Sequence, residues 1–280
     1  MSEAATDQPI RRFIGIDLGG GKGKKTALAV LDRSHNGVTV TELHPHRDED
    51  PLYDVNLIAS LRTLARGAIV CVDAPLTLPP CVRCQVACPG QEACVDPEVA
   101  VLRSLCAPKP ASGGKARKPS ITPYTQRATE AYLLNRRGIF AREALGQGMG
   151  PLTARACHLV RALAGDFRLH EDLIEVSPRA TLELLGFRDP YKKRVDRRIE
   201  ILAQLRDLAF GPGVWREECR QSDPTFDAVL CAYTGYLRWR DGWSAWPEGT
   251  TLPPQAGWIW IPPAEEQAAQ SARAAVTCGD

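Results

Sequence analysis

The chain has 280 residues, of which 44% are hydrophobic and 24% are charged, and its formal net charge is +2. This is an ordinary globular composition that can bury one sizeable core, with or without an insertion. No apolar run is long enough to span a membrane, and the first residues lack the apolar stretch of a secretory signal, so we expect a cytoplasmic protein without membrane contact. The small net charge neither requires nor excludes a nucleic-acid partner.

The N-terminal part of the sequence predicts a sheet. Three apolar segments predict a meander of strands, at 13–18, 26–32 and 38–43. The dipeptide Asn36-Gly37 marks one of the turns between them. Apolar residues at helical spacing then predict a helix at 54–66 that stops at Gly67. The continuous apolar run at 68–73 is typical of a strand covered on both faces, so the order begins βββαβ.

Residues 75–120 interrupt this pattern with many proline, cysteine and glycine residues. The segment contains one expected helix, from about Pro97 to Leu105, with Asp96 as its N-cap. We interpret it as a cysteine-rich insertion.

Helical periodicity returns after this segment. Helices are expected at about 123–145, 152–164, 178–186, 190–209 and 224–238. Short strands are expected at 172–177 and 257–262, and residues 263–280 read as a flexible tail. The resulting α/β order, βββαβ followed by α, β and α, resembles the ribonuclease H-like fold, which would form one domain over residues 11–262.

Three apolar segments each carry a single aspartate at the rim of a strand or at the start of a helix: Asp17, Asp73 and Asp227. Aspartate is a poor strand residue and is costly to bury without a partner, so carboxylates in these places indicate a charge to be bound. If the three converge, they form an all-oxygen site suited to Mg²⁺ or Mn²⁺. Such a site fits metal-assisted cleavage of a phosphodiester bond.

Simpler explanations exist for two of these acids. Asp73 precedes Ala-Pro and could cap a turn, and Asp227 falls in an early helical turn, where the helix dipole favours any carboxylate. Asp17 has no helix to cap. We leave Asp223 out of the site because its position before Pro224 explains it as a helix cap.

The ordered set of motifs GID, VDAPL, ITPYTQRATEAYLL, IEVSPRATL, YKKR and FDAVLCAYTGYL resembles the family called domain of unknown function 429. The resemblance covers roughly residues 11–262. That family is usually described as a predicted RNase H-like nuclease. The resemblance therefore implies an enzyme that hydrolyses nucleic acid, DNA or RNA, with a divalent metal.

The resemblance also implies roles for particular residues. Asp17, Asp73 and Asp227 fall where RNase H-like nucleases keep their metal-binding carboxylates. Glu175 is a candidate fourth catalytic acid, although a carboxylate before Ser-Pro could instead pair with Arg179 or a lysine.

Two basic residues in the family-like motifs, Arg127 and Lys192, are candidate substrate contacts. The remaining basic residues of two segments could hold a phosphate backbone, although a solvated surface is the default explanation: Lys109, Lys115, Arg117 and Lys118, and Lys193, Arg194, Arg197 and Arg198.

Four cysteines lie close together in the spacing Cys81-x2-Cys84-x3-Cys88-x5-Cys94. Four thiolates suit a structural Zn²⁺ that would fix a segment with too few apolar residues for a core of its own. An iron–sulfur cluster and free thiols remain alternatives, and Cys106 is a possible substitute ligand.

Two other functions remain open. The Gly/Lys segment at 19–25 fails as a P-loop, because Leu18 stands where a glycine is needed and Lys25 interrupts the Gly-Lys-Thr ending. A hairpin there could still cradle phosphate as in actin-like and sugar kinases, which share the core fold, so an ATP-dependent phosphotransferase is one alternative. A nucleic-acid-binding protein without catalytic activity is the other.

Overall fold

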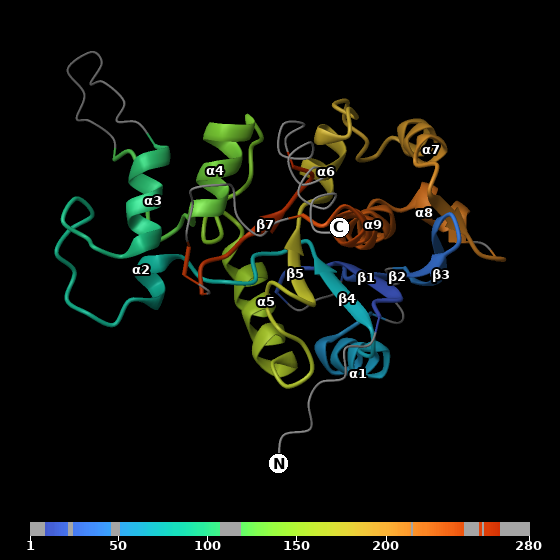
Figure 1. The fold of residues 1–280 in the computed structure, drawn as a ribbon, viewed down its shortest axis with the longest axis horizontal. Helices are drawn as coiled ribbons and strands as arrows, with labels where there is room; N and C mark the ends of the chain where they lie inside the picture. Colours follow the sequence, from blue (N-terminus) through green and yellow to red (C-terminus); the bar gives the residue numbers. More distant parts are fainter. Residues whose placement is uncertain are drawn as a thin grey trace, which may run out of the picture.

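The computed structural model describes residues 9–21, 25–45, 51–106, 119–213, 215–243, 252–253 and 255–263. They form a seven-stranded sheet covered by helices on both faces (Figure 1). The strands are β1 (Arg12–Asp17), β2 (Ala27–Ser34), β3 (Gly37–His44), β4 (Ala68–Val72), β5 (Leu173–Val176), β6 (Leu208–Phe210) and β7 (Ile259–Trp260). The helices are α1 (Asp54–Leu64), α2 (Pro80–Arg83), α3 (Pro97–Leu105), α4 (Ala128–Arg137), α5 (Gly150–Leu163), α6 (Pro178–Leu184), α7 (Val195–Gln204), α8 (Trp215–Gln221) and α9 (Asp223–Asp241).

The strand order across the sheet is β6-β3-β2-β1-β4-β5-β7. Strands β1, β2 and β3 form the antiparallel meander expected from the sequence. The pairs β1–β4, β4–β5 and β5–β7 are parallel. Strands β1, β4 and β5 run in the same direction, so their carboxyl ends lie next to one another. Ile16 lies beside Val72, and Val72 lies beside Glu175.

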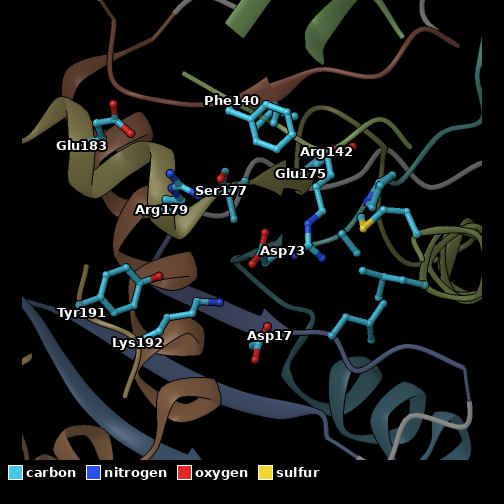
Figure 2. Close-up of a pocket in the computed structure, with 18 of the residues that line it drawn as sticks. Asp17, Asp73, Phe140, Arg142, Glu175, Ser177, Arg179, Glu183, Tyr191 and Lys192 are labelled. Carbon is cyan, nitrogen blue, oxygen red and sulfur yellow. The ribbon is translucent and has the colours of Figure 1, made fainter. Parts of the chain in front are cut away.

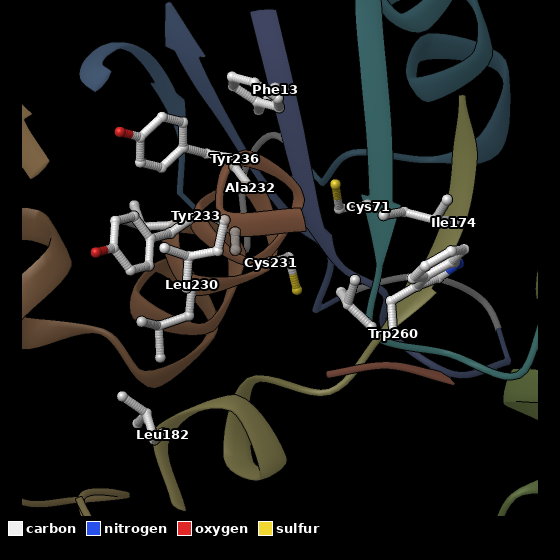
Figure 3. Close-up of a cluster of buried hydrophobic side chains, with 14 of the residues drawn as sticks. Phe13, Cys71, Ile174, Leu182, Leu230, Cys231, Ala232, Tyr233, Tyr236 and Trp260 are labelled. Carbon is white, nitrogen blue, oxygen red and sulfur yellow. The ribbon is translucent and has the colours of Figure 1, made fainter. Parts of the chain in front are cut away.

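Each face of the sheet has its own apolar core, because successive strand side chains point to opposite faces. On one face Phe13, Cys71 and Ile174 pack with α9 (Figure 3). On the other face Ile14 and Val70 belong to a cluster that contains side chains of α1 and α5. In the part of the chain that the structure describes, no helix combines the length and apolar character needed to cross a bilayer.

The long helix α9 lies unusually close to β1 and β4. A Cβ atom at Gly15 of β1 would overlap the carbonyl oxygen of Ala228 in α9, and one at Gly235 of α9 would overlap the sulfur of Cys71 in β4. The two glycines therefore fix how near the helix comes to the strands, and so where the start of α9 sits relative to the ends of β1 and β4.

Some expected elements differ from the structure. The helix expected over 123–145 is only Ala128–Arg137, because Gly138 takes a left-handed conformation (φ 68°) at its end. The helix expected over 190–209 ends at Gln204, and the chain then forms β6, which pairs with β3 at the edge of the sheet. A strand of three residues is too short to show a periodicity of its own, so the pattern merged with the helix before it.

The caps of two helices were also expected. Asp96 does cap α3, accepting hydrogen bonds from the backbone N–H groups of Glu98 and Val99. For α9 the expected cap was wrong, because the Ser222 side chain accepts from the N–H of Thr225 and performs this role. The short helices α2 and α8 were not expected. The tail expected at 263–280 lies outside the described residues, apart from its first residue.

We expect Gly15→Ala to destabilise the protein by about 1–3 kcal/mol, because the added methyl group overlaps the backbone of α9. Urea unfolding measures this change. Gly165→Ala is the matched control, since a Cβ there meets no atom within 4 Å, and it should stay within about 0.5 kcal/mol of the wild type. Equal stability of the two variants would contradict the close approach of α9.

Candidate functional site

Three elements bring the candidate metal ligands together. Asp17 ends β1, Asp73 follows β4 directly, and Asp227 lies near the start of α9. The N–H of Asp73 donates to the carbonyl of Ile16 at 2.9 Å, which continues the β1–β4 pairing up to the site. One carboxylate oxygen from each aspartate lies within 4.8 Å of the others. Residues more than 200 positions apart in the sequence thus form one acidic group.

These carboxylates are difficult to ionise together. Burial, followed by the charges of Asp227 and Asp73, raises the pKa of Asp17 well above its ordinary value. Burial, followed by the charge of Asp227, raises the pKa of Asp73 from 3.8 to about 7. Burial also raises the pKa of Asp227, and Lys192 and Tyr191 oppose this rise. Three like charges in a desolvated site make a bound cation strongly favourable.

Of the three carboxylates, Asp227 is the one that contacts other described side chains. The hydroxyl of Tyr191 donates to its Oδ1 at 2.7 Å, and Lys192 Nζ lies 3.1 Å from its Oδ2. The Lys192 side chain remains 61% exposed. By contrast, no hydrogen bond or ion pair joins the Asp17 or Asp73 carboxylate to another described residue, so these two keep their oxygens available for a ligand.

Glu175 and Arg127, which both line the cavity described below, pair with each other in a buried ion cluster. Arg127 Nη1 and Nη2 donate to the two carboxylate oxygens of Glu175 at 2.8 and 2.7 Å, and the N–H of Leu76 donates to Glu175 Oε2. Arg127 also donates to Glu130 from Nε and Nη2, and to Thr77 from Nη1. Both oxygens of Glu175 are therefore occupied.

This cluster changes two expectations. Glu175, the expected fourth catalytic acid, pairs with Arg127 and not with Arg179 or a lysine, and it lies outside the group of three aspartates. A guanidinium has five N–H donors, and those of Arg127 point to protein acceptors. Arg127 is also fully buried. We therefore no longer expect Arg127 to contact a substrate, because it holds the wall of the site in place.

The cysteine segment is less organised than the acidic group. Cys81, Cys84 and Cys88 are exposed and Cys94 is half-buried, and all four are free thiols. Among the described residues, the side chains that converge as a possible metal group are the three aspartates, and the four thiols do not converge in that way. Structural zinc at these cysteines stays a prediction.

The segment between these cysteines is nevertheless tied to the rest of the fold. Arg83 lies between Cys81 and Cys84 and forms an ion pair with the buried Glu98 of α3. Glu98 in turn accepts a hydrogen bond from the N–H of Ala128, the first residue of α4. Helices α2, α3 and α4 lie together beyond the β7 edge of the sheet (Figure 1).

Asp17 and Asp73 line a cavity of about 660 Å³ (Figure 2), and Asp227 meets them beside it. Its lining includes residues that the sequence analysis did not assign to the site: Phe140, Arg142, Arg179, Phe187, Arg188 and Tyr191. Two of these residues could have been predicted from their positions in the sequence. Tyr191 adjoins Lys192, and Arg179 follows β5 by three residues. Phe140 and Arg142 could not have been predicted in this way, because they lie in irregular chain after α4.

Two basic segments lie partly or wholly outside the described residues. The Gly/Lys segment at 19–25 is described at its ends, where the N–H of Gly19 donates to the hydroxyl of Thr26, but residues 22–24 lie outside the described chain. Lys109, Lys115, Arg117 and Lys118 also lie outside it.

A pH-dependent stability is expected from Asp73 in the metal-free protein. Its pKa is higher in the folded state, so between about pH 4 and pH 7 the folded protein binds this proton more tightly than the unfolded chain. The free energy of unfolding should fall as pH rises through this window, by at most about 1.4 kcal/mol per pH unit. Asp73→Asn should reduce this dependence, and the raised pKa values of Asp17 and Asp227 account for the part that remains.

Urea unfolding with a chelator present, at about pH 5 and pH 7, measures the slope. Asp166→Asn is the control, because Asp166 forms a partly exposed ion pair with Arg62 and neither residue lines the cavity. If wild type and Asp73→Asn lost stability equally with rising pH, the pKa of Asp73 would not be raised in the folded protein as described above.

A second prediction concerns the buried ion cluster. Arg127→Gln leaves Glu130 and Glu175 buried without their cation, so we expect a loss of about 3–5 kcal/mol. Arg12→Gln is the control, because the Arg12–Asp32 pair is 29% and 34% exposed and should cost less than about 1 kcal/mol. Chemical denaturation compares the two, and similar losses would mean that the cluster does not support the cavity wall.

Comparison with known proteins agrees with the resemblance seen in the motifs. A family model described as "Protein of unknown function (DUF429)" matches residues 15–251. No curated protein and no solved structure matches the chain significantly. The matched residues include the three aspartates and the ion cluster around Arg127. The chain belongs to the DUF429 family.

Proposed function

We propose that the protein is a metal-dependent nuclease of ribonuclease H-like fold, in which Asp17, Asp73 and Asp227 hold Mg²⁺ or Mn²⁺. The observation that carries this proposal is the convergence of their carboxylate oxygens within 4.8 Å. Hard divalent cations prefer such oxygen ligands, and Mg²⁺ commonly binds through a few carboxylates while keeping waters and substrate phosphate as its other ligands.

The topology supports the same proposal. The strands lie in the order β3-β2-β1-β4-β5 with β2 antiparallel to β1 and α9 packed on β1, and this supports the ribonuclease H-like fold that we infer from the order of the elements. Two acids come from the ends of the adjacent parallel strands β1 and β4, and the third from the helix that packs on them. Strands β6 and β7 extend this core on its two edges.

The donor set fits a divalent cation. Asp17 and Asp73 offer oxygens without a competing partner in the described chain, whereas Tyr191 and Lys192 each contact one oxygen of Asp227 and orient its carboxylate. A bound metal would supply activation of water and stabilisation of the charge on the phosphate and the leaving oxygen. Lys192, whose side chain is 61% exposed, lines the cavity and adds a positive charge beside the place where a phosphate would lie. Zinc at Cys81, Cys84, Cys88 and Cys94 remains a separate, structural part of the proposal.

The nuclease activity is tested by incubating the protein with single- and double-stranded DNA and RNA and Mg²⁺ or Mn²⁺. Asp17→Asn, Asp73→Asn and Asp227→Asn should each lower the cleavage rate by more than about 100-fold, because losing even an outer partner of a metal ligand costs about 10- to 100-fold. Asp166→Asn, remote from the cavity, should cleave like the wild type.

Two other results would replace the proposal. Calorimetric binding of ATP without any cleavage of nucleic acid would favour the ATP-dependent phosphotransferase. Nucleic-acid binding that neither needs metal nor leads to cleavage would favour a non-catalytic binding protein. Cleavage that persists in Asp17→Asn would mean that a contaminant, or another site, carries the activity.

A further inference from the structure

Three arginines of the cavity have no partner among the described side chains. Several of the described arginines form ion pairs, as Arg127 does with Glu175 and Arg155 with Asp54. In contrast, no hydrogen bond or ion pair joins a side chain of another described residue to the following members of the cavity lining: Arg142, Arg179 and Arg188. Each of the three is exposed. Unpaired guanidinium groups gathered at one cavity indicate an anionic ligand.

Two of these arginines face the same space. Arg142 comes from the chain after α4 and Arg179 from the first turn of α6. Figure 2 shows them on opposite sides of Asp73, and all three residues line the cavity. Burial dominates the raised pKa of Asp73, and the charge of Arg142 acts against that rise, so Arg142 lies within electrostatic range of the acidic group.

An exposed aromatic ring, that of Phe140, lines the same cavity as these arginines. Phe140 is 62% exposed, and Arg142 follows it by two residues. In Figure 2 its ring lies over the cavity on the side away from Asp17. A large apolar ring held in water costs free energy unless a partner covers it, and nucleic-acid bases stack on such rings with little dependence on sequence.

We propose that Arg142, Arg179 and Phe140 form a subsite for a flexible single strand of nucleic acid. Arg142 and Arg179 hold one of its phosphates opposite the three aspartates, and Phe140 stacks against a neighbouring base. A cavity of about 660 Å³ is in the range of sites for small ligands, so it can receive the unstacked bases of a flexible strand. The identity of the strand as the substrate rests on the proposed nuclease function.

Binding is measured without cleavage, by fluorescence anisotropy with a chelator present. The probe is a labelled single strand of about ten nucleotides, DNA or RNA, compared with a blunt duplex of the same length. The wild type should bind the single strand more tightly than the duplex. Its affinity should fall with salt, because each phosphate contact releases counterions.

The variants separate phosphate contacts from stacking. Arg142→Gln and Arg179→Gln should each weaken binding and lower the slope of log affinity against log salt by about 0.7. Phe140→Ala should weaken binding by about 5- to 150-fold with an unchanged slope. Arg66→Gln and Tyr53→Ala are the matched controls, because both residues are exposed and neither lines the cavity.

The outcomes distinguish this subsite from the nuclease proposal. Predicted changes in binding, together with no cleavage under any metal, would support the subsite and reject the nuclease. Equal binding of the duplex, or Arg142→Gln and Arg179→Gln that bind like Arg66→Gln, would overturn the subsite even if the protein cleaves nucleic acid. Absence of any binding by the wild type would overturn it as well.

Discussion

The structure depends on the close packing of α9 against β1 and β4. Gly15 and Gly235 remove the side chains that would keep the helix away from these strands. The start of α9 therefore reaches the carboxyl ends of β1 and β4, and Asp227 joins Asp17 and Asp73. Bringing three carboxylates together costs free energy, as the raised pKa values of all three show. The apolar contacts of the long buried helix offset that cost.

The polar groups around the acids divide into two sets with different roles. Arg127, Glu130 and Glu175 satisfy one another inside the protein, so they hold β5 and α4 in place and leave nothing for a ligand. In this set the cost of burying a charge is not fully offset by its partner. Burial raises the pKa of Glu130 to about 7 even though Arg127 acts against the rise. The exposed arginines of the cavity, Arg142, Arg179 and Arg188, have no partner among the described side chains and are available to an anion. A rigid inner set that supports an unsatisfied outer set is the arrangement expected of a binding site.

The sequence predicted the parts that leave a local pattern. Asp17 and Asp73 stand out because each ends a run of apolar strand residues, and the meander and α9 follow from periodicity. Sequence alone could not show that Glu175 pairs with Arg127, because 48 residues separate them and either could have faced the cavity. The same limit applies to Phe140 and Arg142, whose irregular chain has no period to interpret. Strand β6 was missed because its pairing with β3 is a tertiary contact.

The most direct test of the central claim is a crystal of the protein soaked with Mn²⁺ and measured at a wavelength where manganese scatters anomalously. We predict an anomalous peak between the carboxylates of Asp17, Asp73 and Asp227, at distances of about 2.0–2.3 Å from their oxygens. A map with no peak there, with Asp17 and Asp73 neutralised by basic side chains of the protein itself, would contradict the account.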